Sequence, residues 1–325
     1  TGGVITLNEA RTSLGFDAIT EGGIRRIPSS IVEVAEGGAA PIAVDAAPVE
    51  QGYPALAEIK APRAAPRSQI LRRQMLEERE DETNELASKV LTHFRGIRNR
   101  VDGILGRYME RSATDTKSFP FEAADLLPPI ETGNMSRILE AAYARISKKT
   151  FGSINSSGVA GTLNWSDKLP TVQRILTSAP IRAEMIHSTT SKAIGRAIEM
   201  GLERGYTIQQ LARGVPDDKF PGIRSVLGET ENRAKLIART EVMRTQNATT
   251  TGFFKEQGYE YVRADDVDGD PDDTYVAPGD PYGFTCAERH GQVYRLEDAE
   301  NIEDHPNGTL NWTPMPRGYT PEGNQ

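Results

Sequence analysis

The sequence predicts a mainly α-helical protein with a small α+β domain at its C-terminal end, in which long helices precede a short-stranded, loop-rich tip. Two observations support this prediction. Apolar residues recur at helical spacing between residues 86 and 257, and this pattern stops at Gly258. Beyond that glycine, short alternating segments are separated by Gly, Pro and Asp, which is typical of strands joined by turns.

The N-terminal part of the chain lacks the pattern of a packed domain. Residues 36–66 include 10 Ala, 5 Pro and 3 Gly among 31 residues, so they cannot bury enough apolar surface to offset their ordering entropy. We therefore interpret 36–67 as a flexible Ala/Pro-rich linker and 1–35 as a separate tail. The first residue is Thr and no secretory signal follows, so we expect a processed product or a piece of a longer polypeptide.

The helical region predicted for 68–164 begins with the strongest helix pattern. One stripe of this helix consists of Leu86, Val90, Phe94, Ile97, Val101, Ile104 and Tyr108. Gly96, Gly103 and Gly106 lie off the stripe and indicate either weak points or a close approach of another helix. A second helix is predicted over 134–149, after a Pro-rich break at 120–129.

Helices also dominate the first part of the region from 165 to 316. Separate helices are predicted at 170–179 and 180–201, and Thr207 is a suitable N-cap for a short third one. The residues expected to face inward are Ile181, Met185, Ile194, Ile198 and Leu202. A last long helix is predicted from about 229 to 257, beginning near Thr230 and ending at Gly258 with a left-handed C-cap.

The segment after Gly258 contains two predicted strands, 259–263 and 292–296. The run of Asp, Gly and Pro at 265–283 is predicted to be loop, and 305–325 has no periodicity. We expect 317–325 to be a disordered tail.

The charge distribution disfavours duplex DNA as the main ligand. The formal net charge is −8, and residues 255–304 contribute 15 acidic against 4 basic side chains. Because phosphate neutralisation needs clustered Lys and Arg, and the helices of 134–244 predict only a mildly basic face, we expect any DNA contact to be weak. No segment approaches the roughly 18 consecutive apolar residues of a spanning helix, so no membrane partner is expected.

The residues able to bind metal or perform chemistry gather between 286 and 305. Cys286, His290, Asp304 and His305 are residue types that ligate zinc or form a nucleophilic site. A single cysteine excludes an internal disulfide and an all-cysteine zinc site. We expect no metal and no cofactor, with Cys286, His290 and His305 kept as candidate ligands, because adjacent Asp304 and His305 rarely bind the same ion.

The acidic run at 265–273 has carboxylates at alternate positions, as calcium loops do. Its glycine falls at 269 and no Glu closes the loop, so we favour a flexible acidic turn, and whether it binds a cation stays open. The chain has no nucleophile elbow, phosphate loop or dinucleotide fingerprint, and we therefore expect no enzyme activity.

Within the last helix, Glu241 and Arg244 are one turn apart and could pair. Arg239 is expected to point elsewhere. Charged residues among the small and apolar side chains of this helix indicate a structural role, in which they brace a neighbouring loop through hydrogen bonds.

A set of motifs follows in a fixed order along this part of the chain. They are Leu-Ile-Ala-Arg-Thr-Glu-Val at 236–242, which includes Arg239, Thr240 and Glu241, then Asn247, Cys286, Gly-Gln-Val-Tyr at 291–294, and His305, Pro306 and Asn307. This order resembles the phage head morphogenesis family, which includes the F protein of phage Mu and related minor head proteins. The resemblance covers roughly 165–316.

Many members of that family carry Cys-x-x-Cys and His-Pro-Asn-Cys-x-Cys. Here Arg289, Gly308 and Leu310 replace the other cysteines. The resemblance therefore implies a site held by hydrogen bonds rather than by zinc, with His305 against a carbonyl or carboxylate and a turn at 307–308.

A second resemblance lies in the tail, where Leu-Asn-Glu-Ala-Arg at 7–11, Leu-Gly-Phe at 14–16 and the glycines at 22–23 are similar to the C-terminal end of tailed-phage portal proteins. Together the two resemblances imply a portal protein fused to a minor head domain. They imply a virion structural protein at the portal vertex inside the head, assembled in the host cytoplasm and acting in head morphogenesis and in DNA packaging or ejection. Its partners would be a homo-oligomeric portal ring and a major capsid or scaffolding protein.

The alternative is an enzyme or toxin-like effector carried in the head, with Cys286, His290 and His305 as its centre. Close packing of the cysteine with both histidines around an open pocket would favour this alternative, and separated positions would favour the structural role.

Overall fold

The computed structural model describes residues 66–111, 121–227, 230–266, 275–305 and 308–321. The predicted tail at 1–35 and the linker up to residue 65 lie outside these residues, whereas positions 66 and 67, predicted as linker, already belong to the first helix. The structure confirms the predicted fold class, because the described residues are mainly helical and a small antiparallel sheet lies near the C-terminus.

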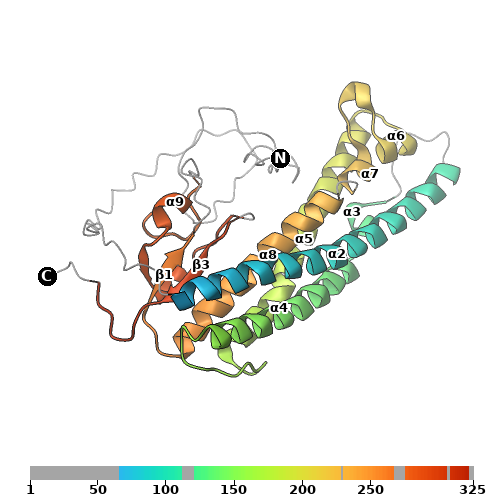
Figure 1. The fold of residues 1–325 in the computed structure, drawn as a ribbon. Helices are drawn as coiled ribbons and strands as arrows, with labels where there is room; N and C mark the ends of the chain where they lie inside the picture. The colour runs from blue at the N-terminus through green and yellow to red at the C-terminus, as the bar shows by residue number, and fades with distance from the viewer. Residues whose placement is uncertain (1–65, 112–120, 228–229, 267–274, 306–307, 322–325) are drawn as a thin grey trace, which may run out of the picture.

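Four long helices form the body of the described part of the chain (Figure 1). They are α2 (Pro66–Arg111), α4 (Ile130–Ser157), α5 (Pro170–Glu203) and α8 (Thr230–Glu256). The short helices α3 (Ala123–Leu126), α6 (Ile208–Arg213), η1 (Pro216–Asp218) and α7 (Gly222–Val226) connect them. Helix α2 packs against both α4 and α8, so the first helix of the bundle also contacts the last one.

The small sheet has the strand order β2-β1-β3, and both pairings are antiparallel. Its strands are β1 (Tyr261–Asp265), β2 (Val293–Arg295) and β3 (Asn311–Pro314), with the short helices α9 (Cys286–Arg289) and α10 (Leu296–Ala299) in the connections. Figure 1 shows the sheet at the end of the bundle where α2 begins, opposite the end that carries α6 and α7. The start of α2 and the end of α8 therefore meet the sheet.

Two hydrophobic clusters form the core. The larger one fills the helical bundle, and its members include Phe94, Leu139, Ile194 and Val242. The smaller one joins the sheet to the ends of the long helices, with Met75, Phe151, Phe253 and Trp312 among its members. Each cluster contains residues from both sides of position 165, so the predicted regions 68–164 and 165–316 share their cores.

The apolar stripe predicted for the first helix is confirmed in its main part. Leu86, Val90, Phe94, Ile97 and Val101 are all buried. At the C-terminal end the stripe passes through Leu105, which is fully buried, instead of Ile104. No atom lies within 4 Å of a Cβ built on the three glycines of this helix, so they mark no close helix approach.

The boundaries and buried face of α5 differ from the prediction. Pro180 lies inside one continuous helix from Pro170 to Glu203, because loss of a single N–H donor does not end a helix that is packed on its neighbours. Ile181, Met185 and Leu202 are exposed, with 66%, 54% and 42% of their surface accessible, although all three were expected to face inward. The buried face instead uses small and polar side chains, which hydrophobic spacing does not reveal: Ala179, Ala183, His187 and Thr190, followed by Ile194 and Ile198 as predicted.

Several other boundaries change as well. Helix α4 extends beyond the predicted 134–149 at both ends, since Gly133 is accommodated within it. Thr207 is the N-cap of α6, as predicted, and exchanges hydrogen bonds with Gln210 in a capping box. Gly258 adopts φ of 75°, which confirms the predicted left-handed C-cap.

The two predicted strands exist, but β1 lies two residues later than predicted and β2 is one residue shorter at each end, and β3 lies in a segment for which no strand was predicted. In β3, Trp312 pairs with Ala264 and is fully buried, so one large side chain fixes a strand too short to show periodicity.

The described part of 317–325 is not disordered: Arg317 donates a 2.8 Å hydrogen bond to the Gln257 carbonyl, and the Tyr319 ring lies 5.7 Å from that of Tyr261. Among the described residues no helix is both long and apolar enough to cross a membrane.

The contact between α8 and the start of α5 depends on Gly252. A Cβ at this position would lie 2.1 Å from Thr171 Cγ2, so we expect Gly252→Ala to destabilise the fold by about 1–3 kcal/mol. Gly195→Ala is the matched control, because that helical glycine has nothing within 4 Å, and it should be neutral or stabilising by about 1 kcal/mol. Urea denaturation followed by circular dichroism measures both changes, and equal effects would mean that this helix contact is not tight.

Candidate functional site

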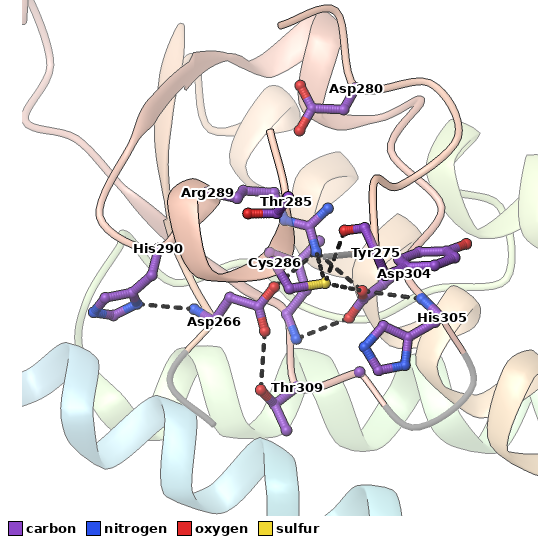
Figure 2. Close-up of polar contacts among 12 residues, drawn as sticks. Asp266, Tyr275, Asp280, Thr285, Cys286, Arg289, His290, Asp304, His305 and Thr309 are labelled. Atoms are coloured by element: carbon purple, nitrogen blue, oxygen red, sulfur yellow. Dashed lines mark hydrogen bonds and ion pairs between the residues drawn. The ribbon is translucent and has the colours of Figure 1, made fainter. Parts of the chain in front are cut away.

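The candidate residues of the C-terminal region meet around a buried guanidinium group, shown in Figure 2. We refer to Asp266, Cys286, Arg289, Asp304 and Thr309 as the Arg289 cluster. They come from the end of β1, from α9 and from the segment that leads into β3. The cluster therefore joins α9, which lies outside the sheet, to the end of β1 and to the segment that leads into its partner strand β3.

Arg289 is the centre of the cluster and its side chain is completely buried. Its Nη2 atom donates to Asp266 Oδ2 at 2.7 Å, to Asp304 Oδ1 at 3.0 Å and to Cys286 Sγ at 3.3 Å. Burial alone would lower the pKa of Arg289, but attraction to the two carboxylates outweighs it and raises that pKa. The guanidinium is thus a permanent cation that two buried carboxylates neutralise.

Both carboxylates have further partners. Asp266 Oδ1 accepts a hydrogen bond from the Thr309 hydroxyl at 3.0 Å, and Asp304 Oδ2 accepts one from the Leu310 backbone N–H at 3.1 Å. Gly308 is needed beside them, because a Cβ there would lie 1.8 Å from Asp304 Oδ2. The two carboxylates hold the chain between α10 and β3 in place.

Local sequence explains how Cys286 and Arg289 come to face the same side. Thr285 is the N-cap of α9, where its Oγ1 accepts from the Glu288 N–H and Glu288 Oε2 accepts from the Thr285 N–H. This backbone hydrogen bond lowers the pKa of Glu288. The capping box starts a single helical turn, and residues three apart on that turn lie on one face.

The two histidines of this region occupy different places (Figure 2). His290 is exposed and points away from the cysteine, and its Nδ1 accepts the Asp266 N–H at 3.1 Å. His305 lies beside the cluster: its backbone N–H donates to Asp304 Oδ1 at 3.0 Å, and its ring packs edge-on against Tyr275 at 5.0 Å. Burial raises the pKa of Tyr275 to about 12. Pro306 and Asn307 lie outside the described residues, and so does the predicted turn that involves Asn307.

Cys286, Asp304 and His305 could supply three metal ligands, since their ligand atoms lie within 4.8 Å of one another. Within the described part of the chain they are the only such group. A zinc ion would need to come within about 2.0–2.3 Å of each donor atom. The Nη2 atom of Arg289 is already within hydrogen-bonding distance of two of them, so its positive charge opposes a metal ion there. The residues present do not fit a resident metal.

The acidic run was only partly anticipated by the sequence. Asp265 and Asp266 are buried, so the prediction of a flexible acidic turn is wrong for these two residues. Asp265 pairs with Arg263 at 3.0 Å and accepts a hydrogen bond from Thr313 on β3. Alternation along β1 could have revealed the pair, because residues two apart share a face of a strand. The other acidic residues of the run, 268–273, lie outside the described residues.

Arg79 of α2 connects the bundle to this site and was missed by the sequence analysis. Its guanidinium donates to Gln246 Oε1 at 2.8 Å, to the carbonyls of Gly308 and Leu310 at 2.9 and 3.1 Å, and to Asn311 Oδ1 at 3.2 Å. Burial lowers the pKa of Arg79 to about 10, against the opposing attraction of the nearby carboxylates. Its position in a helix with alternating charges offered no signal that would separate it from solvent-exposed arginines.

Glu241, in the motif of the last helix, has different partners from the one that helical spacing allows. It accepts hydrogen bonds from Arg182 Nε and Nη2 at 2.9 and 2.6 Å and from the Tyr143 hydroxyl, and it is buried. Arg244, which helical spacing offered as a possible partner, points outward and binds Glu303 at 2.9 Å instead. Burial, followed by the charge of Glu241, raises the pKa of Tyr143. Glu241 therefore braces α4, α5 and α8 against one another.

The remaining motif residues of this helix are spread over different environments. Arg239 is exposed, as expected for a residue directed elsewhere, and the Thr240 hydroxyl donates to the Leu236 carbonyl of the preceding turn at 3.0 Å. Asn247 is buried near the helix centre. The structure does not bring these residues together into one site.

Comparison of the chain with protein-family models, with curated proteins and with solved structures finds no match.

Proposed function

We propose that this chain is a phage virion structural protein, a minor head protein tethered to the portal that acts in head morphogenesis. The observation that carries the proposal is the order of motifs from Arg239 to Asn307, together with the portal-like residues at 7–23. In this proposal the protein lies at the portal vertex inside the head and is assembled in the host cytoplasm.

The geometry of the candidate site supports a binding role rather than catalysis. The charges of the Arg289 cluster are paired with one another, and the cysteine is buried. An enzyme needs its reactive groups to be accessible to a substrate, whereas the Cys286 thiol and the Arg289 guanidinium are both buried.

Tethering is the proposed mechanism. A domain joined covalently to a ring subunit has a high effective concentration at that ring, so a weak contact surface is enough to hold a capsid or scaffolding protein there. The symmetry of a homo-oligomeric portal would repeat that surface around the axis. The tethered domain would influence DNA packaging or ejection through its position at the portal ring, and its own contact with DNA would be weak.

The test is to express this chain joined to the polypeptide encoded upstream of it, and in parallel the same protein ending at residue 35. We expect both to form rings with the same number of subunits by native mass spectrometry, and the longer form to add one C-terminal domain per subunit. An upstream polypeptide that is not a portal protein, or one that forms no ring, would overturn the proposal.

The alternative of a head-carried enzyme or effector is favoured by one observation, the proximity of Cys286 to Asp304 and His305. A catalytic thiol must be accessible, so the rate of alkylation by iodoacetamide distinguishes the two functions. We expect the folded protein to react at least a hundredfold more slowly than the urea-unfolded protein. Comparable rates would favour the enzyme.

A further inference from the structure

The helical bundle contains a second group of titratable side chains, far along the sequence from the Arg289 cluster. His93 of α2 and His187 of α5 face each other, with their Nε2 atoms 3.2 Å apart and their ring centroids 5.4 Å apart. His187 is 4% exposed, and the His93 side chain is 6% exposed. The pair thus forms a buried polar contact between two helices of the bundle.

The contact requires that at least one of the two rings is neutral. A hydrogen bond between two Nε2 atoms needs one protonated donor and one unprotonated acceptor. His93 Nδ1 lies 3.6 Å from Glu131 Oε2, so His93 can carry its proton on Nδ1 and accept from His187 Nε2–H. In that arrangement the buried Nδ1 of His187, for which the described residues provide no hydrogen-bond partner, is left as an acceptor.

The charged groups around the pair act in both directions, because Glu131 favours a further proton whereas the nearby arginines oppose it. From α2, Arg100 already binds Glu131 of α4, the one carboxylate that faces the pair in the described structure, and Asn134 of α4 donates to the same group. From α8, Arg233 donates to the Thr190 hydroxyl at 2.6 Å and lies over the Phe94 ring. If both imidazoles were protonated, two cations would face each other with their Nε2 atoms 3.2 Å apart. Glu131 is the one carboxylate that faces this pair of cations in the described structure, and Arg100 already binds it.

We propose that the His93–His187 contact is a pH-sensitive latch in the bundle core, which joins α2 to α5 at neutral pH and is lost when both imidazoles are protonated. Burial lowers the pKa of His93, and burial together with His93 lowers that of His187 from 6.5 to about 4. Since the folded state binds this proton less readily than the open state, the latch is complete above about pH 6.5. It weakens as the pH falls from there towards 4.

Backbone amide exchange followed by mass spectrometry tests the latch in the whole chain, at about pH 7.5 and about pH 5.0, with EDTA present and rates corrected for intrinsic exchange. We expect the opening of residues 183–195 to increase at least tenfold at the lower pH, whereas residues 253–264 near the sheet change less than twofold. His187→Gln, which can donate a hydrogen bond but does not titrate in this range, should reduce the response of 183–195 to less than twofold. His290→Gln is the matched control and should respond as the wild type does.

The proposal would be overturned if the opening of residues 183–195 in the wild type increased less than twofold at the lower pH. It would also be overturned if a tenfold increase persisted in His187→Gln. If His187→Gln does not fold, His93→Gln replaces it, and the imidazole nitrogen signals of the wild-type protein provide an independent readout. Titration midpoints at or above about pH 6.5 for both buried histidines would also overturn it.

Discussion

Replacing Arg289 with Met is expected to lower the free energy of unfolding by about 3–5 kcal/mol, because it leaves two buried carboxylates without their cation. Asp266 and Asp304 are both paired with the single Nη2 atom of this arginine. A methionine side chain is unbranched and fills much of the same space, so the loss reports charge and hydrogen bonding more than a cavity. Urea denaturation monitored by tryptophan fluorescence measures it, since Trp312 lies in the neighbouring core.

Two further variants define the origin of this effect. Arg295→Met removes an exposed arginine of the same region, whose side chain is 63% accessible, and should leave stability unchanged within the error of the measurement. Asp266→Asn should cost less in the Arg289→Met background than in the wild type, with a coupling of about 1–3 kcal/mol. Additive effects would contradict the view that the two residues form one charge-paired unit.

The position of Arg289 also shows what the sequence could and could not predict about the site. The sequence led us to expect a site held by hydrogen bonds in this region, with His305 against a carbonyl or carboxylate. It did not indicate which carboxylates the guanidinium would meet, because Asp266 directly follows β1 whereas Asp304 lies far along the chain, beyond α10. Such contacts depend on how a short sheet folds back on itself, and no local spacing encodes that geometry.

The helices illustrate the same distinction. Spacing predicted α2 and its buried stripe, since large apolar residues repeat on one face there. It failed on α5, where Ala183, His187 and Thr190 face the core while Ile181 and Met185 face outward. Close packing of helices favours small side chains at contacts, and hydrogen bonds satisfy the polar ones. Hydrophobicity alone therefore assigned the wrong face.

Replacing Glu241 with Ala is the second change with a large expected effect, a loss of about 3 kcal/mol in the free energy of unfolding. The substitution leaves the Arg182 guanidinium, which is largely buried, without its carboxylate, and it removes the acceptor of the buried Tyr143 hydroxyl. Because these partners lie on α5 and α4, the loss should affect the whole bundle. Thermal and urea denaturation followed by far-ultraviolet circular dichroism measure it.

Arg244→Ala distinguishes the observed partners from the pair that helical spacing allows. Arg244 and Glu303 are both substantially exposed, with 40% and 54% of their side chains accessible, so this change should cost less than about 0.5 kcal/mol. If Glu241 paired with Arg244 instead, the two substitutions would have similar effects and Arg182→Met would have almost none. A large loss for Glu241→Ala and Arg182→Met, with a small one for Arg244→Ala, identifies this motif as a brace between three helices. The motif would then be needed for the fold of the bundle.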